Sequence, residues 1–320
     1  MNPSPLDQSP FDLRGKRVYV AGHNGMVGRA LVRQLAHEDC EIVTASRAEL
    51  DLCDQAGVQR FFSDRKPQVV IMAAAKVGGI YANDTRPGDF LYDNLVMQTN
   101  VIGAALAQGV EKLTFLSSSC IYPRLAPQPM REEALLAGPL EPTNEWYAIA
   151  KIAGVKMCQA FRRQHGVDFI SAMPTNLYGP FDNFDLSSSH VLPALMAKAH
   201  QAKVAGAPLL PVWGSGAPLR EFMHVDDCAR AILFLTRNYS GESHINVGSG
   251  EEVSIRELAQ TIAKAIGLEA ELSFDANKPD GAPRKLMDSS RLLAMGWRPQ
   301  VTLDQGLSST YEWFLENVAA

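Results

Sequence analysis

Lys16-Arg17-Val18-Tyr19-Val20-Ala21-Gly22-His23-Asn24-Gly25-Met26-Val27-Gly28 runs from a short apolar segment into three glycines spaced G-x-x-G-x-x-G. The residues that follow, up to Leu35, place apolar side chains at helical spacing. This order predicts a strand, a glycine turn and a helix, which is how a mononucleotide-binding unit begins. Without side chains, backbone N–H groups and the helix N-terminus can approach a pyrophosphate. We therefore predict a dinucleotide site at the glycines, although a tight turn under a closely packed helix would use the same residues.

Four more short apolar runs follow, at residues 41–44, 69–74, 113–117 and 169–173, and helical stretches separate them. Alternation of strands and helices is typical of a parallel sheet with helices on both faces. Strands covered on both faces are expected to be apolar almost throughout, as these runs are. The predicted fold class is α/β, with a Rossmann-type doubly wound parallel sheet.

The pattern loosens after residue 177, where loops with Pro and Gly surround a helical stretch at residues 191–202. Helical spacing resumes at residues 225–237 and 254–266, which predicts a return to the sheet before the chain finishes at residues 272–300. We expect three parts. They are a flexible tail at 1–15, a coenzyme-binding Rossmann domain at 16–177 with returns near 225–266, and a smaller C-terminal α/β substrate-binding domain over most of 178–320. A single uninterrupted α/β domain with long loops is the alternative.

The composition is that of an ordinary globular protein, with 46% hydrophobic residues and a net charge of −5 over 320 residues. Such a chain has no overall positive field to gather nucleic acid or anionic lipid, so neither partner is expected. The five cysteines are odd in number and lack C-x-x-C spacing, which argues against a disulfide framework or a structural zinc site. We expect a reducing, cytoplasmic location, no metal, and no membrane span, because the longest apolar runs have the length of strands.

Tyr147 and Lys151 are four positions apart in a helical stretch, so they are neighbours on one helix face. An ammonium beside a phenol is expected to lower the pKa of Tyr147 from its usual ~10. Ser118 stands where the fourth strand ends, at the edge where open parallel sheets bind ligands. We predict that Ser118 polarises a substrate oxygen, that Tyr147 exchanges the proton, and that Lys151 tunes Tyr147 and holds the coenzyme ribose. Each feature alone also fits an ordinary helix or turn.

Arg47 follows the second strand, where NAD-selective sites usually carry an acidic residue for the ribose hydroxyls. An arginine there favours a 2′-phosphate, and therefore NADP(H) as the coenzyme. Because Glu49 and Asp51 lie close by in the sequence, a solvated surface arginine is the alternative.

Dense motifs recur from residue 16 to residue 317. They are the glycine motif, Ala73-Ala74-Ala75-Lys76-Val77-Gly78-Gly79-Ile80, Ser118 to Pro123, Glu141-Pro142-Thr143-Asn144 with Tyr147 and Lys151, Met173-Pro174-Thr175-Asn176-Leu177-Tyr178-Gly179-Pro180, Trp213-Gly214-Ser215-Gly216 and Arg220-Glu221-Phe222. Together these segments resemble the extended short-chain dehydrogenase/reductase family, and most narrowly its members that act on GDP-4-keto-6-deoxy-D-mannose. The chain departs from the pattern of this family in two places: its N-terminal tail is longer, and Ser117 stands where a glycine is common.

The resemblance implies epimerisation of that nucleotide sugar at C3 and C5, followed by NADPH reduction of its C4 ketone to give GDP-L-fucose. It also gives Cys120 and His190 roles, because carbons beside a ketone are acidic and an acid and a base on opposite faces invert them. Ser118 and Tyr147 would serve both stages at the oxygen where charge develops. Without the resemblance, Cys120 is a small buried hydrophobe and His190 a cap of the helix that follows.

The resemblance further implies two groups of binding residues. NADP(H) is expected to contact Gly22, His23, Asn24, Gly25, Met26, Val27, Gly28, Arg47, Asp51, Leu52, Leu116, Ser117, Ser119, Lys151, Pro174, Asn176, Leu177 and His190. The GDP-sugar is expected to contact Lys198, Trp213, Arg220 and Asp280, the last within Lys278-Pro279-Asp280-Gly281. Basic side chains match the charge of a diphosphate, and tryptophan packs against a sugar or base. Taken alone, Trp213 is more often a core residue, and Arg220 beside Glu221 a surface ion pair.

Two other functions remain open from the sequence. A related nucleotide-sugar epimerase or dehydratase of the same fold would keep NAD bound and regenerate it, and Arg47 together with Cys120 and His190 argues against that reading. A non-catalytic, NADP-sensing protein is the second, and the retention of Tyr147 and Lys151 argues against it. The resemblance also implies a homodimer joined through helices of the large domain.

Overall fold

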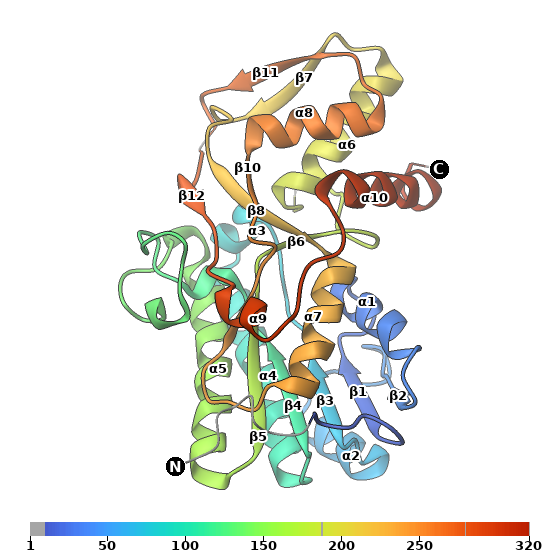
Figure 1. Ribbon diagram of the computed structural model, residues 1–320, viewed down its shortest axis with the longest axis vertical. Coiled ribbons are helices and arrows are strands. Elements are labelled where there is room, and N and C mark those ends of the chain that lie inside the picture. The colour runs from blue at the N-terminus through green and yellow to red at the C-terminus, as the bar shows by residue number, and fades with distance from the viewer. Residues whose placement is uncertain (1–9, 187, 279, 320) are drawn as a thin grey trace.

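The computed structural model describes residues 10–186, 188–278 and 280–319. Most of the expected flexible tail, together with Ser187 and Pro279, therefore lies outside the described residues. The described chain forms a large body around one parallel sheet and a small body above it (Figure 1).

The large body is built on a six-stranded sheet in which each strand is parallel to its neighbours. Its order is β2-β1-β3-β4-β5-β9. The strands are β1 (Arg17–Ala21), β2 (Glu41–Val43), β3 (Val69–Met72), β4 (Lys112–Leu116), β5 (Asp168–Pro174) and β9 (Ile245–Val247). The predicted doubly wound fold is confirmed.

Helices cover both faces of this sheet, and the strands alternate their side chains between two apolar cores. Tyr19 and Ala21 face one core, and Val18 and Val20 face the other. The first core is closed by α2 (Gln55–Arg65), α4 (Pro87–Ala107) and α5 (Glu145–His165), and the second by α1 (Met26–Leu35) and α7 (Val225–Asn238). Burial on both faces explains the nearly continuous apolar strands.

The small body has its own core, formed mainly by three helices packed against short strands. The helices are α6 (Val191–Ala205), α8 (Ile255–Ile266) and α10 (Leu303–Asn317). One sheet contains β6 (Asn176–Tyr178), β8 (Leu219–His224), β10 (Glu252–Ser254) and β12 (Arg284–Lys285), and a second pairs β7 (Leu209–Trp213) with β11 (Glu271–Asp275). Short helices complete the structure: α3 (Ile80–Thr85), α9 (Ser290–Ala294) and the 3-10 turns η1 (Ser119–Ile121), η2 (Glu132–Ala134) and η3 (Pro142–Asn144).

The chain crosses between the two bodies more than once. The predicted return near residues 225–266 includes α7 and β9, but α8 packs in the core of the small body. A later segment also returns, because Leu292 and Trp297 are buried in the core behind α1 and α7. The amphipathic pattern of α8 could not reveal which body its apolar face would cover.

The sheet order reverses between β1 and β3, and in open α/β sheets ligands bind at the carboxyl ends of the strands at such a point. Of the helices that the structure describes, none is long and apolar enough to cross a membrane. A search of the same residues finds no group of three or more His, Cys, Asp or Glu side chains placed to hold a metal ion.

Candidate active site

The glycine turn after β1 is closed so tightly that two of its positions exclude any side chain. Gly22 has a φ of +87°, and a Cβ there would lie 2.7 Å from the Cα of Ala74. A Cβ on Gly28 would lie 2.1 Å from the carbonyl oxygen of Gly22. The turn therefore packs directly against the β3 loop and against α1, whose N-cap is Gly25. This leaves the first-turn N–H groups of α1 available to an anion.

The rim beside this turn carries an exposed arginine, Arg47, just after β2. The carboxylate of Glu49 accepts hydrogen bonds from the backbone N–H and the hydroxyl of Ser46, at 2.7 and 2.8 Å, and these bonds lower the pKa of Glu49. Asp51 accepts a hydrogen bond from the N–H of Cys53 at 2.9 Å. The two neighbouring carboxylates are thus engaged with the backbone of their own loop. Leu52 fixes this loop to α4, because its carbonyl accepts a hydrogen bond from Asn100 at 2.9 Å.

The lysine of the Tyr147 pair is a buried anchor between α5 and β4. Its Nζ donates to the carbonyl oxygen of Leu116 at 2.9 Å and lies 4.8 Å from the centre of the Phe115 ring. The same nitrogen lies 5.9 Å from the centre of the Tyr147 ring. Burial lowers the pKa of Lys151 to about 8. The bond brings the start of α5, and so Tyr147, to the carboxyl end of β4 where Ser118 lies.

The expected effect of Lys151 on Tyr147 is wrong for this structure. Burial raises the pKa of Tyr147 above its ordinary value, and the nearby Cys120 acts in the same direction. The ammonium of Lys151 is directed at the Leu116 carbonyl, so its attraction for a phenolate does not offset the loss of water around the ring. Tyr147 is therefore a neutral phenol at neutral pH, which suits a proton donor.

Cys120 and His190 come from distant parts of the chain, and the charge of Lys285 acts on both. Cys120 lies buried in η1, and burial raises the pKa of its thiol, against the effects of Lys285, a Ser118 hydrogen bond and Lys151. Burial, and then the charge of Lys285, lower the pKa of His190. His190 is an exposed residue, although many protein atoms lie around its imidazole.

The reading of His190 as a side-chain cap is wrong. Its backbone occupies the N-cap position of α6, but its imidazole makes no capping hydrogen bond. The imidazole therefore remains available for a ligand. The loop that precedes His190 is held by a hydrogen bond, in which the N–H of Gly79 donates to the carbonyl of Ser188 at 2.9 Å. A Cβ on Gly79 would lie 2.8 Å from the Ser189 carbonyl, which explains a glycine at this position.

Lys285 is a site residue that the sequence did not predict. It lies in β12, and its charge reaches both Cys120 and His190. Burial lowers the pKa of Lys285 itself, and Cys120 opposes this shift. In the sequence, only the adjacent cations Arg284 and Lys285 pointed to this part of the site. The pair did not show which of the two side chains lies near Cys120 and His190. Arg284 points elsewhere, because it pairs with Glu252 at 2.7 Å.

The predicted substrate residues gather at one end of the small body. Trp213 is 56% exposed, so it is not a core residue. The ammonium groups of Lys198 and Lys278 lie 4.6 and 5.1 Å from its ring centre. The carboxylate of Asp280 accepts hydrogen bonds from the N–H and hydroxyl of Ser215, at 2.7 and 2.8 Å. Two cations beside an exposed indole form a surface suited to an anionic, planar ligand.

The ion pair considered between Arg220 and Glu221 is absent among the described contacts. Arg220 donates to the backbone carbonyls of Leu219 and Asp280, at 2.8 and 3.5 Å. Glu221 is completely buried, and its carboxylate accepts hydrogen bonds from the N–H groups of Gly250 and Met287, at 2.8 and 3.2 Å. Glu221 therefore ties loops together, and the Arg220 guanidinium keeps donors for a ligand.

The other predicted coenzyme residues lie along the carboxyl ends of the central strands. Ser117 and Ser119 flank Ser118 at the end of β4, and both are buried. Pro174 ends β5, and Leu177 follows in β6. Asn176 is partly engaged, because its amide donates to the carbonyl of Glu221 at 2.8 Å. These residues therefore lie between the glycine turn and Tyr147 along the carboxyl ends of the strands.

The fold agrees with that of known proteins. A family model described as the NAD dependent epimerase/dehydratase family matches residues 18–248. The chain is 60% identical over 307 residues to the GDP-L-fucose synthase of Sinorhizobium fredii, covering 96% of this chain and 98% of that relative. It is 54% identical over 312 residues to the Escherichia coli GDP-L-fucose synthase, covering 94% and 97%.

Among solved structures, the chain is similar to a GDP-L-fucose synthetase from Naegleria fowleri bound to NADP. The TM-score is 0.92 at 32% sequence identity, and the match covers 100% of this chain and 99% of that chain. The similarity therefore extends through both bodies.

Proposed function

Because this chain belongs to the NAD dependent epimerase/dehydratase family and matches its GDP-L-fucose synthases over nearly its whole length, we propose that it is itself a GDP-L-fucose synthase. The reaction converts GDP-4-keto-6-deoxy-D-mannose to GDP-L-fucose by epimerisation at C3 and C5 and NADPH-dependent reduction at C4. The observation that supports the proposal is electrostatic: Cys120 acts on the pKa of Tyr147, and Lys285 acts on the pKa values of both Cys120 and His190.

NADP(H) fits the glycine turn and its rim. Gly22 and Gly28 let the turn pack directly against the β3 loop and α1, and Arg47 is an exposed cation free of pairing with Glu49. The turn, Arg47 and Lys151 would hold the coenzyme. When bound, NADPH supplies the hydride that reduces C4.

For epimerisation, the two pKa shifts suggest which group removes the proton. His190, with a lowered pKa, is a neutral base at neutral pH, and Cys120, with a raised pKa, is a protonated acid. The base takes the proton beside the ketone, and the thiol delivers one to the opposite face. The hydroxyls of Ser118 and Tyr147 stabilise the enolate oxygen that forms between the two transfers. Exchange with water then restores the imidazole and the thiol.

For reduction, the same phenol acts as general acid. Tyr147 donates its proton to the C4 oxygen as that carbon becomes an alcohol, and Ser118 keeps the oxygen in place. Burial of Lys151 at the Leu116 carbonyl fixes the angle of α5 and with it the position of the phenol. The GDP moiety is proposed to bind at Trp213, Lys198, Arg220 and Asp280, since the exposed indole and the cations beside it suit a base and a diphosphate.

The proposed function is tested by the product. Purified protein given GDP-4-keto-6-deoxy-D-mannose and NADPH should consume NADPH, and proton NMR with mass spectrometry should identify GDP-L-fucose. A family member that only epimerises or dehydrates would form a product with no net loss of NADPH absorbance. A non-catalytic NADP-binding protein would form no product at all.

Replacing Arg47 by alanine should raise the KM for NADPH by about ten- to hundredfold and leave the KM for NADH nearly unchanged. A charge-assisted hydrogen bond contributes about 1.5–3 kcal/mol, and each 1.4 kcal/mol is about a tenfold change in affinity. Steady-state kinetics with both coenzymes measures the effect. Arg60→Ala is the control, since this arginine is exposed on α2 beside Asp54. An equal rise in the KM for NADH and for NADPH would show that Arg47 does not bind the 2′-phosphate.

The assignment of His190 as the base predicts an unusual pH profile. A base works in its deprotonated form, and a lowered pKa keeps His190 deprotonated below its ordinary value of 6.5. Solvent deuterium incorporation at C3 and C5 should therefore stay constant as the pH falls to 6.5 and decline only below it. His190→Asn should remove this decline together with most of the rate. A decline that persists in this variant belongs to another group.

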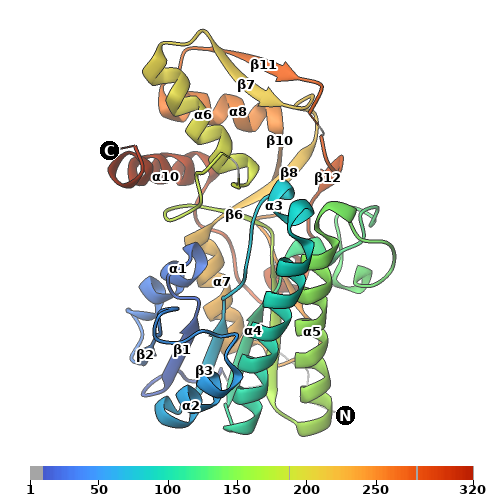
Figure 2. The same cartoon turned by 180° about the vertical axis from the view of Figure 1, so that it is seen from behind.

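We also propose a homodimer that forms through α4 and α5. Figure 2 shows these two long helices side by side on the outer side of the large body. Tyr92 on α4 and Trp146 and Ile149 on α5 expose large apolar side chains there. Light scattering should give twice the mass of one chain, and Ile149→Asp should lower this mass. A single-chain mass for the wild type at micromolar concentration would contradict the dimer.

A cytoplasmic location and the division into a coenzyme domain and a substrate domain are part of the same proposal. All five cysteines are free thiols, and three of them are buried, which is consistent with a reducing compartment. The separate cores of the two bodies support a division near residue 177, within β6.

A further inference from the structure

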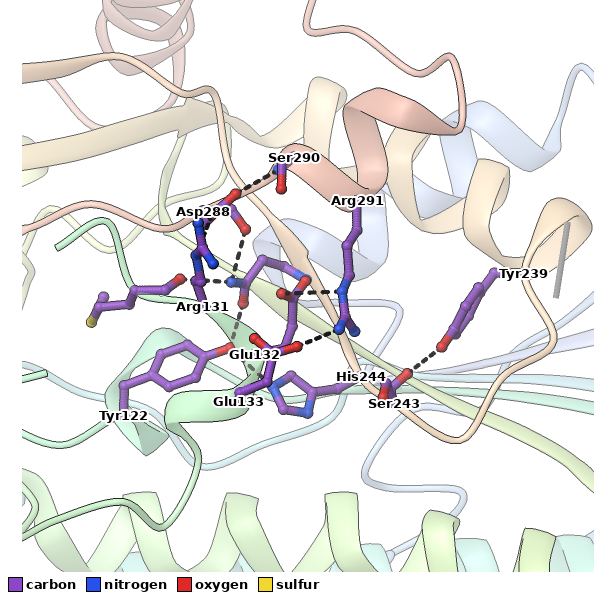
Figure 3. Close-up of polar contacts among 12 residues, drawn as sticks. Tyr122, Arg131, Glu132, Glu133, Tyr239, Ser243, His244, Asp288, Ser290 and Arg291 are labelled. Atoms are coloured by element: carbon purple, nitrogen blue, oxygen red, sulfur yellow. Dashed lines mark hydrogen bonds and ion pairs between the residues drawn. The ribbon is translucent and has the colours of Figure 1, made fainter. Parts of the chain in front are cut away.

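A buried polar network joins Tyr122, Glu132 and Asp288 (Figure 3). Asn246 of β9 is its centre. The Tyr122 hydroxyl donates to Asn246 Oδ1 at 2.5 Å. The Asn246 amide donates to the carbonyls of Met130 and Asp288, both at 3.0 Å. The Asn246 backbone N–H donates to Glu132 Oε1 at 3.1 Å. One asparagine thus joins the loop after η1, the turn η2 and the segment before α9.

The hydrogen bonds around Tyr122 determine which atom donates each proton. Its single hydroxyl proton goes to Asn246, whose amide oxygen can only accept, so the ring nitrogen Nε2 of His244 must donate to the Tyr122 oxygen at 2.9 Å. Burial lowers the pKa of His244 to about 4, so the ring is neutral and carries its proton on Nε2. Tyr122, His244 and Asn246 are all buried, and removal of one partner leaves the others unsatisfied.

The same region connects the Cys120 loop with the small body. The N–H of Met130 donates to the carbonyl of Leu286, and the N–H of Asp288 donates to the carbonyl of Met130, both at 2.8 Å. Arg291 extends the connection by ion pairs with Glu132 and Glu133. Because β12 ends at Lys285, this pairing aligns the strand that carries Lys285 with the loop that carries Cys120.

The two reactive side chains at the end of β4 are held in different ways. Ser118 lies two residues after β4, and the N–H of Ser117 beside it still makes a sheet hydrogen bond to the carbonyl of Ala172 at 2.9 Å. Cys120 lies two residues further, inside η1, where a hydrogen bond with Ser118 holds it on one side and the chain after the turn holds it on the other. Tyr122 is the first residue after that turn with a buried polar anchor.

We propose that Tyr122 and Asn246 are positioning residues that hold the thiol of Cys120 at the substrate for epimerisation, while Ser118 is held mainly by the end of β4 and Tyr147 by α5 through Lys151. This inference rests on the proposed function. It adds that different parts of the structure position the residues for epimerisation and the residues for reduction. Loosening the network should therefore slow proton transfer at C3 and C5 more than hydride transfer at C4.

The test measures the two stages separately in Tyr122→Phe and in His244→Ala. Epimerisation is followed as solvent deuterium incorporation into GDP-4-keto-6-deoxy-D-mannose with NADP⁺ bound, and hydride transfer as oxidation of GDP-L-fucose by NADP⁺. We expect Tyr122→Phe to lower the kcat of deuterium incorporation by about ten- to hundredfold, because a misplacement of about 1 Å has effects of this size. Its KM and its hydride transfer should stay within about twofold of wild type. His244→Ala keeps the bond from Tyr122 to Asn246 and should give a smaller loss with the same selectivity.

Tyr239→Phe is the matched control. Its hydroxyl is also buried nearby and donates to the Ser243 carbonyl at 2.7 Å, but it makes no bond to the Cys120 loop (Figure 3). Its thermal midpoint should fall about as much as that of Tyr122→Phe, with both stages preserved. Equal losses in the two stages, or no loss, would overturn the positioning role. If the wild type catalyses neither stage, the proposed function fails instead.

Discussion

Tyr147→Phe should lower the kcat of NADPH oxidation with GDP-4-keto-6-deoxy-D-mannose by about 10²- to 10⁴-fold, the usual contribution of a general acid. The substitution removes only the hydroxyl, and the ring remains packed against the first core. Binding of NADPH should therefore stay within about twofold of wild type. Stopped-flow absorbance at the NADPH band measures the rate, and quenching of protein fluorescence measures binding.

The raised pKa of Tyr147 strengthens this expectation. A neutral phenol holds the proton that the C4 oxygen needs, so its loss cannot be rescued by changing the pH within the neutral range. Tyr92→Phe serves as the control, because this tyrosine is exposed on α4 and the substitution keeps its ring in the proposed dimer face. A Tyr147→Phe enzyme that oxidised NADPH at the wild-type rate would assign the proton transfer to another group.

Cys120→Ser should lower solvent deuterium incorporation at C3 and C5 by about 10²- to 10⁴-fold and leave coenzyme affinity nearly unchanged. A serine hydroxyl is a much weaker acid than a thiol, and the hydrogen bond with Ser118 can persist. Proton NMR in deuterium oxide follows the exchange. Oxidation of GDP-L-fucose by NADP⁺ should remain measurable, because it needs only Tyr147, Ser118 and Lys151.

Cys158→Ser is the matched control for the chemistry of Cys120. Cys158 is also a buried thiol, and burial raises its pKa to about 12, but it lies two turns beyond Lys151 in α5. Any loss caused merely by burying a hydroxyl should appear in both variants. Unchanged deuterium incorporation in Cys120→Ser would remove this thiol from the mechanism.

Local patterns predicted the fold well because the information in them is local. The apolar spacing at residues 26–35 matches the bounds of α1, and the G-x-x-G-x-x-G spacing reflects contacts within one turn, such as Gly28 against the Gly22 carbonyl. Parallel strands need apolar side chains on both faces, so each one is visible in the sequence by itself.

The electrostatics of the site could not be predicted in the same way. The sequence showed Lys151 beside Tyr147 but not that the ammonium is bonded to Leu116, nor that burial would dominate the pKa of the phenol. Lys285 was missed because its position near Cys120 and His190 depends on β12 pairing with β8, far from Cys120 in the chain. Asn246 carries no sequence signal, since a buried asparagine is recognised only by the partners around it. Tyr122 lies in the motif from Ser118 to Pro123, but the motif does not show which partner its hydroxyl binds.

The repeated crossing between the two bodies has a consequence for biosynthesis. A ribosome that has released the chain only as far as Pro174 exposes the open edge of β5, because β9 is not yet made. Leu292 and Trp297, which complete the core behind α1 and α7, emerge later still. The nascent large body therefore stays unfinished until most of the polypeptide has left the exit tunnel. We expect chaperones to bind that unpaired edge during synthesis. Two fragments separated at the junction of β5 and β6 would each expose unpaired strands or apolar surface, and they would aggregate instead of folding as independent domains.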